Sequence, residues 1–450
     1  MNLHAAGLRS RSLRSGTVRR PAVRGSACHC SRRAVGLTPL RAGDSLPGRH
    51  ASEGTKGTQG DDAVTDADAV ELRRQLHAHP ELSGRESGTA RRVRAFVESA
   101  RPDDIVAGLG GHGLAAVFEG PHDGPTVLLR AELDALPISE AGDREHASTV
   151  PGVAHVCGHD GHAAALAAVA PRLDRVRPSR GRAVLLFQPA EETGKGAAAV
   201  IADPAFRPLR PDAAFAIHNL PGLALGRVYL REGPMALGSV AAVIRLVGRS
   251  AQAGYPESAL SPALATAALV EGLTGLGPDA GGGDPLALST VTHARLGERA
   301  LGTTPGEAEV IATVRSGSAS SLESLKRAVL GLAEESARRH GLAHEVTWEE
   351  EFPVTTNDAD ALETARRAAR SLGLETGELD GPLHWSEDFG HFSALTDAVL
   401  LGLGAGEDLV PLHNASYDFP DELVTTGADL LYAIVREILG PYGSEEPIPH

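Results

Sequence analysis

The chain has 450 residues, of which 42% are hydrophobic and only 4% aromatic, and its formal net charge is −15 at pH 7. This length allows two or three domains with cores built mostly from Ala, Val and Leu. An acidic chain argues against nucleic acid as a partner, and no apolar run approaches the roughly 20 residues of a membrane-spanning helix. We therefore expect a globular protein whose partners are neither nucleic acid nor a membrane.

Residues 1–60 differ in composition from the rest of the chain. The first 50 residues hold ten arginines against a single acid, Asp44, and show no sustained hydrophobic periodicity. This pattern predicts a disordered Arg-rich leader. It is typical of an organelle transit peptide, and a plain disordered tail or a start codon assigned too early are the alternatives. Beyond the leader Cys157 is the one cysteine, which fits a reducing compartment, so we expect the cytoplasm, or an organelle if the leader directs import.

Order is expected to begin near Thr65, which can cap a helix that Pro80 ends, with a second helix over 86–99. Farther on, short apolar runs alternate with helical patterns, which is typical of an α/β sheet. Each run is apolar on both faces, as in central strands that helices cover on both sides. The runs are 126–129, 183–187, 213–217 and 398–401.

Acidic or imidazole side chains follow each of the four apolar runs. Because open α/β sheets bind ligands beyond the carboxyl ends of their strands, groups far apart in sequence can meet in one crevice there. In chain order these residues are Glu132 and Asp134, Glu191 and Glu192, His218, and His413.

The densest polar motif is His155-Val156-Cys157-Gly158-His159-Asp160-Gly161-His162, directly before an alanine-rich helical run. Thiolate and imidazole ligands two residues apart, on a Gly-broken turn before a helix, suit a tight divalent-metal site. Neighbouring imidazoles gain nothing from packing and repel one another when protonated. The motif therefore favours a metal site over a purely structural role.

Ligands from the strand ends can complete such a site. Cys157, His159, one glutamate of the adjacent pair, His218 and His413 make five ligands, enough for two metal ions that share the thiolate, because a metal deprotonates a thiol outright. Adjacent glutamates in a loop point differently, so one can bind metal while the other takes a proton from a metal-bound water and returns it to a leaving amine. Sulfur and imidazole suit zinc, and the carboxylate also allows manganese.

Residues 239–350 are predicted to form a separate unit. Strands over 240–248, 286–296, 307–315 and 343–350 and helices over 258–275 and about 320–340 give the order β-α-β-β-α-β. That order suits a small two-layer insertion with an exposed sheet edge, often used for dimerisation. The predicted organisation is a leader over 1–60, a catalytic domain over 61–238 and 351–450, and a lid or dimerisation domain over 239–350.

Seven motifs in order resemble those of the dinuclear metallopeptidases of the aminoacylase and carboxypeptidase G type. The chain looks most similar to the amidohydrolase branch of hippurate hydrolases and indole-acetyl-amino-acid hydrolases. The match runs over about 70–440 through LHAHPELSGRE, RAELDALPISE, HVCGHDGHAAALAAVA, FQPAEETGKGA, AIHNLPGLALGRV, WSEDFGHF and LHNASYDFPDELV.

The resemblance implies a zinc-peptidase-like catalytic domain with a mixed central sheet flanked by helices, and an inserted α+β lid that makes a homodimer. It implies Glu191 as the general acid/base. Behind these groups, or against the substrate, it places Asp134, Asp160, Glu387 and Asp388. As ligands of two divalent ions (Mn²⁺ or Zn²⁺) it implies Cys157, His159, Glu192, His218 and His413.

The chain departs from the family pattern at three places. Glu132 stands where the family usually has Asp. Gln252 stands where relatives often have a lid histidine thought to reach the partner subunit's site and polarise the scissile carbonyl, and the lost charge weakens such a donor. Gly302 stands where relatives often have an Asn that holds the substrate carboxylate. Arg315 could take over that role; the alternative is that Arg315 is an ordinary arginine on the surface of a strand.

The sequence as a whole favours a metal-dependent amidohydrolase that cleaves N-acyl amino acids, small peptides or related amides, through a metal-activated water with Glu191 as general acid/base. One alternative is a non-catalytic relative that binds amides or peptides in the same cleft, motivated by Gln252. The other is a dinuclear hydrolase of esters or phosphates, which the acidic chain and the use of Glu191 on an amine disfavour.

Overall fold

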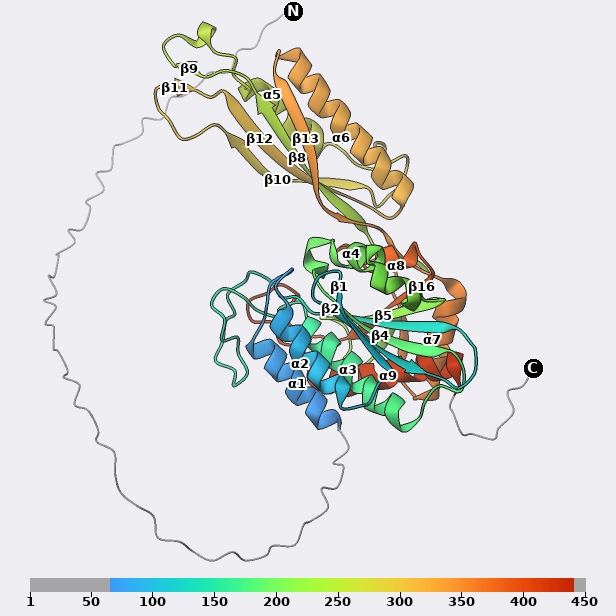
Figure 1. Cartoon of the computed structure of the whole chain (residues 1–450). Coiled ribbons are helices and arrows are strands. Elements are labelled where there is room, and N and C mark those ends of the chain that lie inside the picture. The colour runs from blue at the N-terminus through green and yellow to red at the C-terminus, as the bar shows by residue number, and fades with distance from the viewer. Residues whose placement is uncertain (1–64, 441–450) are drawn as a thin grey trace, which may run out of the picture. The chain divides into compact units, whose positions relative to one another are not determined.

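The computed structural model describes residues 65–440, and the predicted leader over 1–60 lies outside the described residues. An eight-stranded mixed sheet and a separate four-stranded antiparallel sheet, each with its own helices, make up the described part of the chain (Figure 1). The predicted fold class, an α/β catalytic domain with an inserted α+β unit, is confirmed. No helix within residues 65–440 combines the length and the apolar character needed to cross a membrane.

The four apolar runs of the sequence form the middle of the large sheet, as predicted. They become the neighbouring strands β4, β3, β5 and β16, which are parallel to one another, so their carboxyl ends share one edge. The strand order is β1-β2-β4-β3-β5-β16-β6-β15. The strands are β1 Asp104–Leu109, β2 Gly113–Glu119, β3 Thr126–Glu132, β4 Arg182–Gln188, β5 Ala213–Leu220, β6 Val228–Leu230, β15 Thr376–Glu378 and β16 Asp397–Gly404.

Helices cover both faces of the large sheet (Figure 1). Successive residues of a strand point to opposite faces, and Val127 and Leu129 of β3 join one hydrophobic core while Leu128 joins the other. The first core packs against α1 Asp66–Ala78, α2 Ser87–Glu98, α3 His159–Arg175, α7 Ala359–Ser371 and α9 Glu422–Leu439. The second packs against α4 Gly196–Ala202 and α8 Gly390–Ser393, with short 3-10 helices at Glu191–Thr193 and Pro204–Leu209.

Two of these helices show how the sequence builds the domain. Thr65 caps α1, because its hydroxyl accepts from the Asp68 backbone N–H while the Asp68 carboxylate accepts from the Thr65 N–H at 2.7 Å. The alanine-rich run becomes α3, which is buried along most of its length. Alanine loses no side-chain entropy in a helix, and its small side chain lets α3 lie close to both the sheet and α9.

The second sheet has the predicted β-α-β-β-α-β order of its main elements. Its strands follow the order β10-β12-β8-β13, and α5 and α6 share a hydrophobic core with it. These elements are β8 Gly238–Val247, α5 Ala263–Thr274, β10 Leu288–Leu296, β12 Glu307–Ser316, α6 Ala319–Arg339 and β13 Ala343–Phe352. Short pairs not expected from the sequence are β9 Ala251–Gln252 with β11 Thr303–Thr304 and β7 Gly233–Ala236 with β14 Thr355–Asn357, and a 3-10 turn covers Pro256–Ser258.

A glycine in α3 lets two parts of the fold approach closely. A Cβ atom on Gly161 would stand 2.3 Å from the ring of Phe419, which follows the segment carrying His413. We expect Gly161→Ala to lower the free energy of unfolding by about 1–3 kcal/mol, because a packed ring must shift. The matched control is Gly331→Ala in α6, where a Cβ meets nothing within 4 Å and helix propensity predicts a gain of up to about 1 kcal/mol. Urea denaturation measures both, and equal effects would contradict this explanation.

Candidate metal centre

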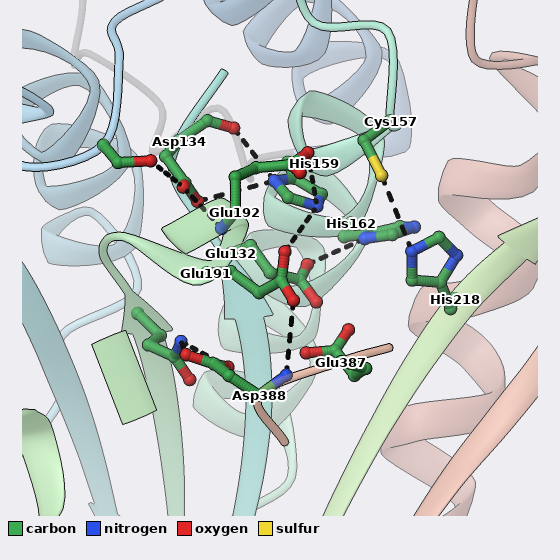
Figure 2. Close-up of polar contacts among 12 residues, drawn as sticks. Glu132, Asp134, Cys157, His159, His162, Glu191, Glu192, His218, Glu387 and Asp388 are labelled. Atoms are coloured by element: carbon green, nitrogen blue, oxygen red, sulfur yellow. Dashed lines mark hydrogen bonds and ion pairs between the residues drawn. The ribbon is translucent and has the colours of Figure 1, made fainter. Parts of the chain in front are cut away.

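The turn before α3 brings a thiol and an imidazole to the same place. Gly158 has a φ of 96°, and a Cβ atom on it would stand 2.6 Å from Asn219 Oδ1. Only glycine fits both this left-handed conformation and this close approach. As a result Cys157 and His159 lie on the two sides of the turn with their side chains toward the carboxyl ends of the strands (Figure 2).

Five side chains from four separate segments, Cys157 among them, converge on one place. One possible ligand group joins Cys157, His159 and His218, and another joins Cys157, Glu192 and His413, with the ligand atoms of each group within 4.8 Å of one another. Cys157 Sγ lies 3.8 Å from His218 Nε2, and Glu192 Oε1 lies 3.8 Å from His413 Nε2 and 3.9 Å from His159 Nε2. The structure thus brings together all five residues that the sequence proposed as ligands, in two groups that share the thiol.

Backbone carbonyls orient two of the imidazoles. His159 Nδ1 lies 2.9 Å from the carbonyl oxygen of Asp134, and His218 Nδ1 lies 2.9 Å from that of Asn219. A carbonyl oxygen can only accept, so each Nδ1 carries the proton and each Nε2 keeps a lone pair directed at the cluster, as in protein metal sites. Among the described residues, His159 Nε2 and Glu192 Oε1 are buried without a hydrogen-bond partner. These unsatisfied atoms fit a site that binds metal.

Asp134 ties His159 to the loop that carries the two glutamates. Its Oδ1 lies 3.5 Å from His159 Nδ1, and its Oδ2 accepts from the Glu192 backbone N–H at 3.0 Å and from Ser83 Oγ at 2.7 Å. Asp134 is fully buried, and its pKa is lowered by these hydrogen bonds against the effect of burial. Asp134 is thus placed to orient His159 and the loop that carries Glu192.

Burial governs protonation in the cluster. Burial raises the pKa of the Cys157 thiol, and it raises the pKa of Glu192 to about 7. It also lowers the pKa of His218, which favours the neutral imidazole that metals bind. The thiol and the carboxyl both need a nearby positive charge to ionise here, and a divalent cation supplies it.

Glu191 lies beside the ligand groups, at the start of a tight turn. Ala190 before it has a φ of 54°, a strained conformation for alanine of the kind found at functional sites. Glu191 Oε2 lies 3.8 Å from His159 Nε2, and its Oε1 accepts from the Asp388 backbone N–H at 3.3 Å (Figure 2). Burial, followed by the charge of Glu387, raises the pKa of Glu191.

A buried arginine, which sequence analysis missed, holds the acids behind Glu191. Arg130 in β3 is fully buried; its Nη2 donates to Glu387 at 2.9 Å and to Asp388 at 2.7 Å, and its Nη1 donates to Glu132. Its Nε donates to Gln188 Oε1 at 2.9 Å. A charged residue inside an apolar strand was the available signal, because arginine is almost never fully buried unless paired.

Glu132 belongs to the same network. Its second oxygen lies 2.7 Å from Nδ1 of His162, whose Nε2 lies 2.5 Å from Asn219 Oδ1. The longer side chain at position 132 thus joins Arg130 to the imidazole behind His218. His162 therefore supports the cluster from behind.

Two of the predicted site residues lie elsewhere. Asp160 Oδ2 is 2.8 Å from His77 Nδ1 and 3.5 Å from Arg73 Nε, so it binds α1 to the first turn of α3. Gln252 is exposed on β9, where it pairs with Thr303, and it does not line the cavity at the cluster. The described chain by itself does not bring Gln252 to the ligand groups.

A cavity of about 190 Å³ opens beside the ligands. Besides ligand residues and Glu191, its walls include two apolar side chains, Trp385 and Leu412, which sequence analysis did not assign to the site. Trp385 packs on His218 with 4.5 Å between ring centroids. The lining residues are Cys157, Glu191, Glu192, His218, Trp385, Ser386, Glu387, Leu412 and His413.

Solved structures with this fold include a dinuclear metal-binding peptidase, the YXEP protein of Bacillus subtilis. It superposes with a TM-score of 0.71 at 27% sequence identity, over 83% of this chain and 98% of that protein. A tripeptidase from Staphylococcus aureus, at 16% identity and a TM-score of 0.65, shares the fold.

The family model of Peptidase family M20/M25/M40 matches residues 128–437, and the chain belongs to this family of hydrolases. An IAA-amino acid hydrolase of Arabidopsis thaliana (ILR1-like 4) is 32% identical over 80% of this chain and 83% of its own length. The hippurate hydrolase of Campylobacter jejuni is 29% identical over 79% and 93%. An N-acetylcysteine deacetylase of Bacillus subtilis is 28% identical over 80% and 93%. The resemblance seen in the sequence is thereby confirmed.

The Arg130 network predicts a large loss of stability when its cation is removed. We expect Arg130→Met to lower the free energy of unfolding by about 3–5 kcal/mol, because buried carboxylates lose their partner. Urea denaturation followed by circular dichroism measures the loss. The matched control is Arg94→Met, which breaks a half-exposed ion pair with Glu98 and should cost no more than about 1 kcal/mol. Similar losses in the two variants would contradict the role given to Arg130.

Proposed function

We propose that the protein is a dinuclear metal-dependent amidohydrolase that cleaves the amide bond of N-acyl amino acids, small peptides or related amides. The observation that carries the proposal is the pair of ligand groups sharing Cys157, with Glu191 beside them. The relatives named for N-acetylcysteine, hippurate and IAA-amino acid substrates support the same class of bond. The dinuclear metal binding of the YXEP protein supports two metal ions here.

The donor set fits two divalent ions. In this proposal Cys157, His159, His218, Glu192 and His413 would hold them, with Cys157 common to the two ligand groups. Thiolate and imidazole suit zinc, while the carboxylate also suits manganese. When bound, the two ions would act as Lewis acids toward the scissile carbonyl and would lower the pKa of a water molecule.

Glu191 carries the proton in this mechanism. Its carboxylate takes a proton from the attacking water and gives it to the nitrogen of the departing amine. The raised pKa of Glu191, caused first by burial and then by Glu387, makes its carboxylate a stronger base than that of an ordinary glutamate, and the protonated carboxyl keeps its proton until the departing amine takes it. Its hydrogen bond from the Asp388 backbone N–H holds one oxygen and leaves the other free to reach the water.

Arg315 is proposed to bind the carboxylate of the substrate. Its Nη1 donates to Ser386 Oγ at 2.7 Å, and Ser386 lines the cavity. Burial lowers the pKa of Arg315, and no acidic side chain within residues 65–440 acts to raise it. A partly buried guanidinium without an acid beside it can receive a carboxylate in a two-pronged contact.

A homodimer through the second domain is part of the proposal. Strand β10 is an edge strand of the four-stranded sheet, and most of its residues are exposed or half-buried. An unpaired strand edge can pair with a second copy of the same chain. In such a dimer Gln252 would have to act from the partner, where its amide can still donate a neutral hydrogen bond.

Replacing Glu191 tests the mechanism directly. We expect Glu191→Gln to keep two equivalents of zinc or manganese, measured by plasma emission spectrometry, because the ligand residues are intact. Turnover of N-acyl amino acids should fall at least about 10²-fold, because a positioned general base contributes that much. Wild-type activity in Glu191→Gln, or a fully metal-loaded wild type that hydrolyses no N-acyl amino acid or dipeptide, would refute the assignment.

Replacing Arg315 tests carboxylate recognition. We expect Arg315→Ala to raise KM for N-acetyl amino acids by roughly tenfold or more, as one lost charged hydrogen-bond partner does, with a smaller effect on the matching N-acetyl amino-acid amides. Arg245→Ala, on neighbouring β8 and paired with Glu309, is the control and should change neither value. Equal losses on acids and amides would show that Arg315 acts on structure alone.

A further inference from the structure

A tryptophan forms one wall of the cavity. The indole of Trp385 lies against the imidazole of His218, with 41° between the ring planes. Leu412 is the other apolar lining residue. The remaining walls carry carboxylate, imidazole, hydroxyl or thiol groups, so an apolar part of a substrate has favourable contacts only with Trp385 and Leu412.

The cavity is small for what it has to hold. Its volume is about 190 Å³, and a dry cavity of about 150 Å³ holds a single benzene molecule. The two proposed ions, a water molecule with its share of about 30 Å³ and the scissile carbonyl must fit in the same space. The space that remains against Trp385 and Leu412 is about that of one ring or less, so it fits an acyl chain of a few carbons better than an aromatic acyl group.

Two consecutive residues, Trp385 and Ser386, lie on the sides of the cavity that would receive the acyl group and the amino acid, respectively. Trp385 contacts His218, while Ser386, the next residue, accepts from Arg315. If the carboxylate of the amino acid lies at Arg315, then the acyl group is left with the side of the cavity that Trp385 and Leu412 form. Trp385 therefore sits where the length of the acyl group is limited.

We propose that Trp385 is a specificity-determining residue that restricts the enzyme to short aliphatic acyl groups, acetyl to about butyryl, on the amino acid nitrogen. The inference rests on the proposed amidohydrolase function and names its substrate class. Removal of the indole opens the wall next to His218 and admits larger acyl groups.

The test compares kcat/KM for the N-acetyl, N-butyryl, N-benzoyl and N-indol-3-ylacetyl derivatives of one amino acid. Wild type should favour acetyl over benzoyl by roughly tenfold or more, and Trp385→Ala should raise the benzoyl-to-acetyl ratio by roughly tenfold or more, as reshaped apolar pockets do. Metal content is measured in every variant. Trp385→Leu keeps an apolar contact on His218 and replaces the alanine variant in the test if that variant loses metal. The benzoyl-to-acetyl ratio of Trp385→Leu should also rise.

The matched control is Trp348→Phe, at the chain's other tryptophan, on β13 beside Lys326. Its acyl preference should equal that of wild type. A wild type that prefers benzoyl over acetyl overturns the proposal. So does a metal-loaded Trp385 variant whose ratio stays within twofold of wild type.

A binding measurement separates this inference from the mechanism. The double variant Trp348→Phe, Glu191→Gln has Trp385 as its one tryptophan. In the metal-loaded protein, N-acetylalanine should change the Trp385 fluorescence at lower concentration than N-benzoylalanine. An unchanged signal at saturation, established by calorimetry, or the opposite order of affinity overturns the role of Trp385. Continued hydrolysis by this variant would instead refute the role of Glu191 and leave the order of affinities as a separate result.

Discussion

The site depends on the burial of several acidic side chains at the carboxyl ends of the parallel strands in the mixed sheet. Glu132, Glu191, Glu387 and Asp388 all lie there with almost no exposure to solvent. An uncompensated buried charge costs several kcal/mol, so acids gathered in this way must either lose their charge or meet cations. Arg130 is the cation that the chain itself supplies, and it contacts three of the four carboxylates directly.

Arg130 compensates only the inner half of this acidic region. Toward the cavity, Glu192 Oε1 and His159 Nε2 remain buried without hydrogen-bond partners, and burial raises the pKa of both Cys157 and Glu192. The chain thus provides permanent positive charge behind Glu191, and the proposed metal ions would compensate the front of the site. In the proposed mechanism this division keeps Glu191 available as a base: the fixed cation is held by other acids, and no arginine or lysine hydrogen bond reaches the Glu191 carboxylate among the described residues.

The parts of the site that were predictable are those in which local sequence determines geometry. Cys157 and His159 share one turn. Each of the other proposed ligands follows a run that is apolar on both faces, as is typical of a central strand. Arg130 was not recognised, because its partners at positions 387 and 388 lie more than 250 residues away. Trp385 was missed for a related reason, since only the fold brings its ring onto His218. Edge strands such as β1, with a mostly exposed pattern, carry too little hydrophobic periodicity to be predicted.

The segment from Trp385 to Asp388 joins the chemistry to the choice of substrate. Trp385 packs on a proposed metal ligand, Ser386 contacts Arg315, Glu387 and Asp388 bind Arg130, and the Asp388 backbone N–H holds Glu191. The acids at its end are fixed by a fully buried arginine, and the first two residues are held in addition by their own contacts to His218 of β5 and Arg315 of β12. Substitutions at position 385 can therefore reshape the cavity wall while Glu191, the proposed proton carrier, keeps its place, so that under the proposed function one catalytic apparatus could serve different acyl groups.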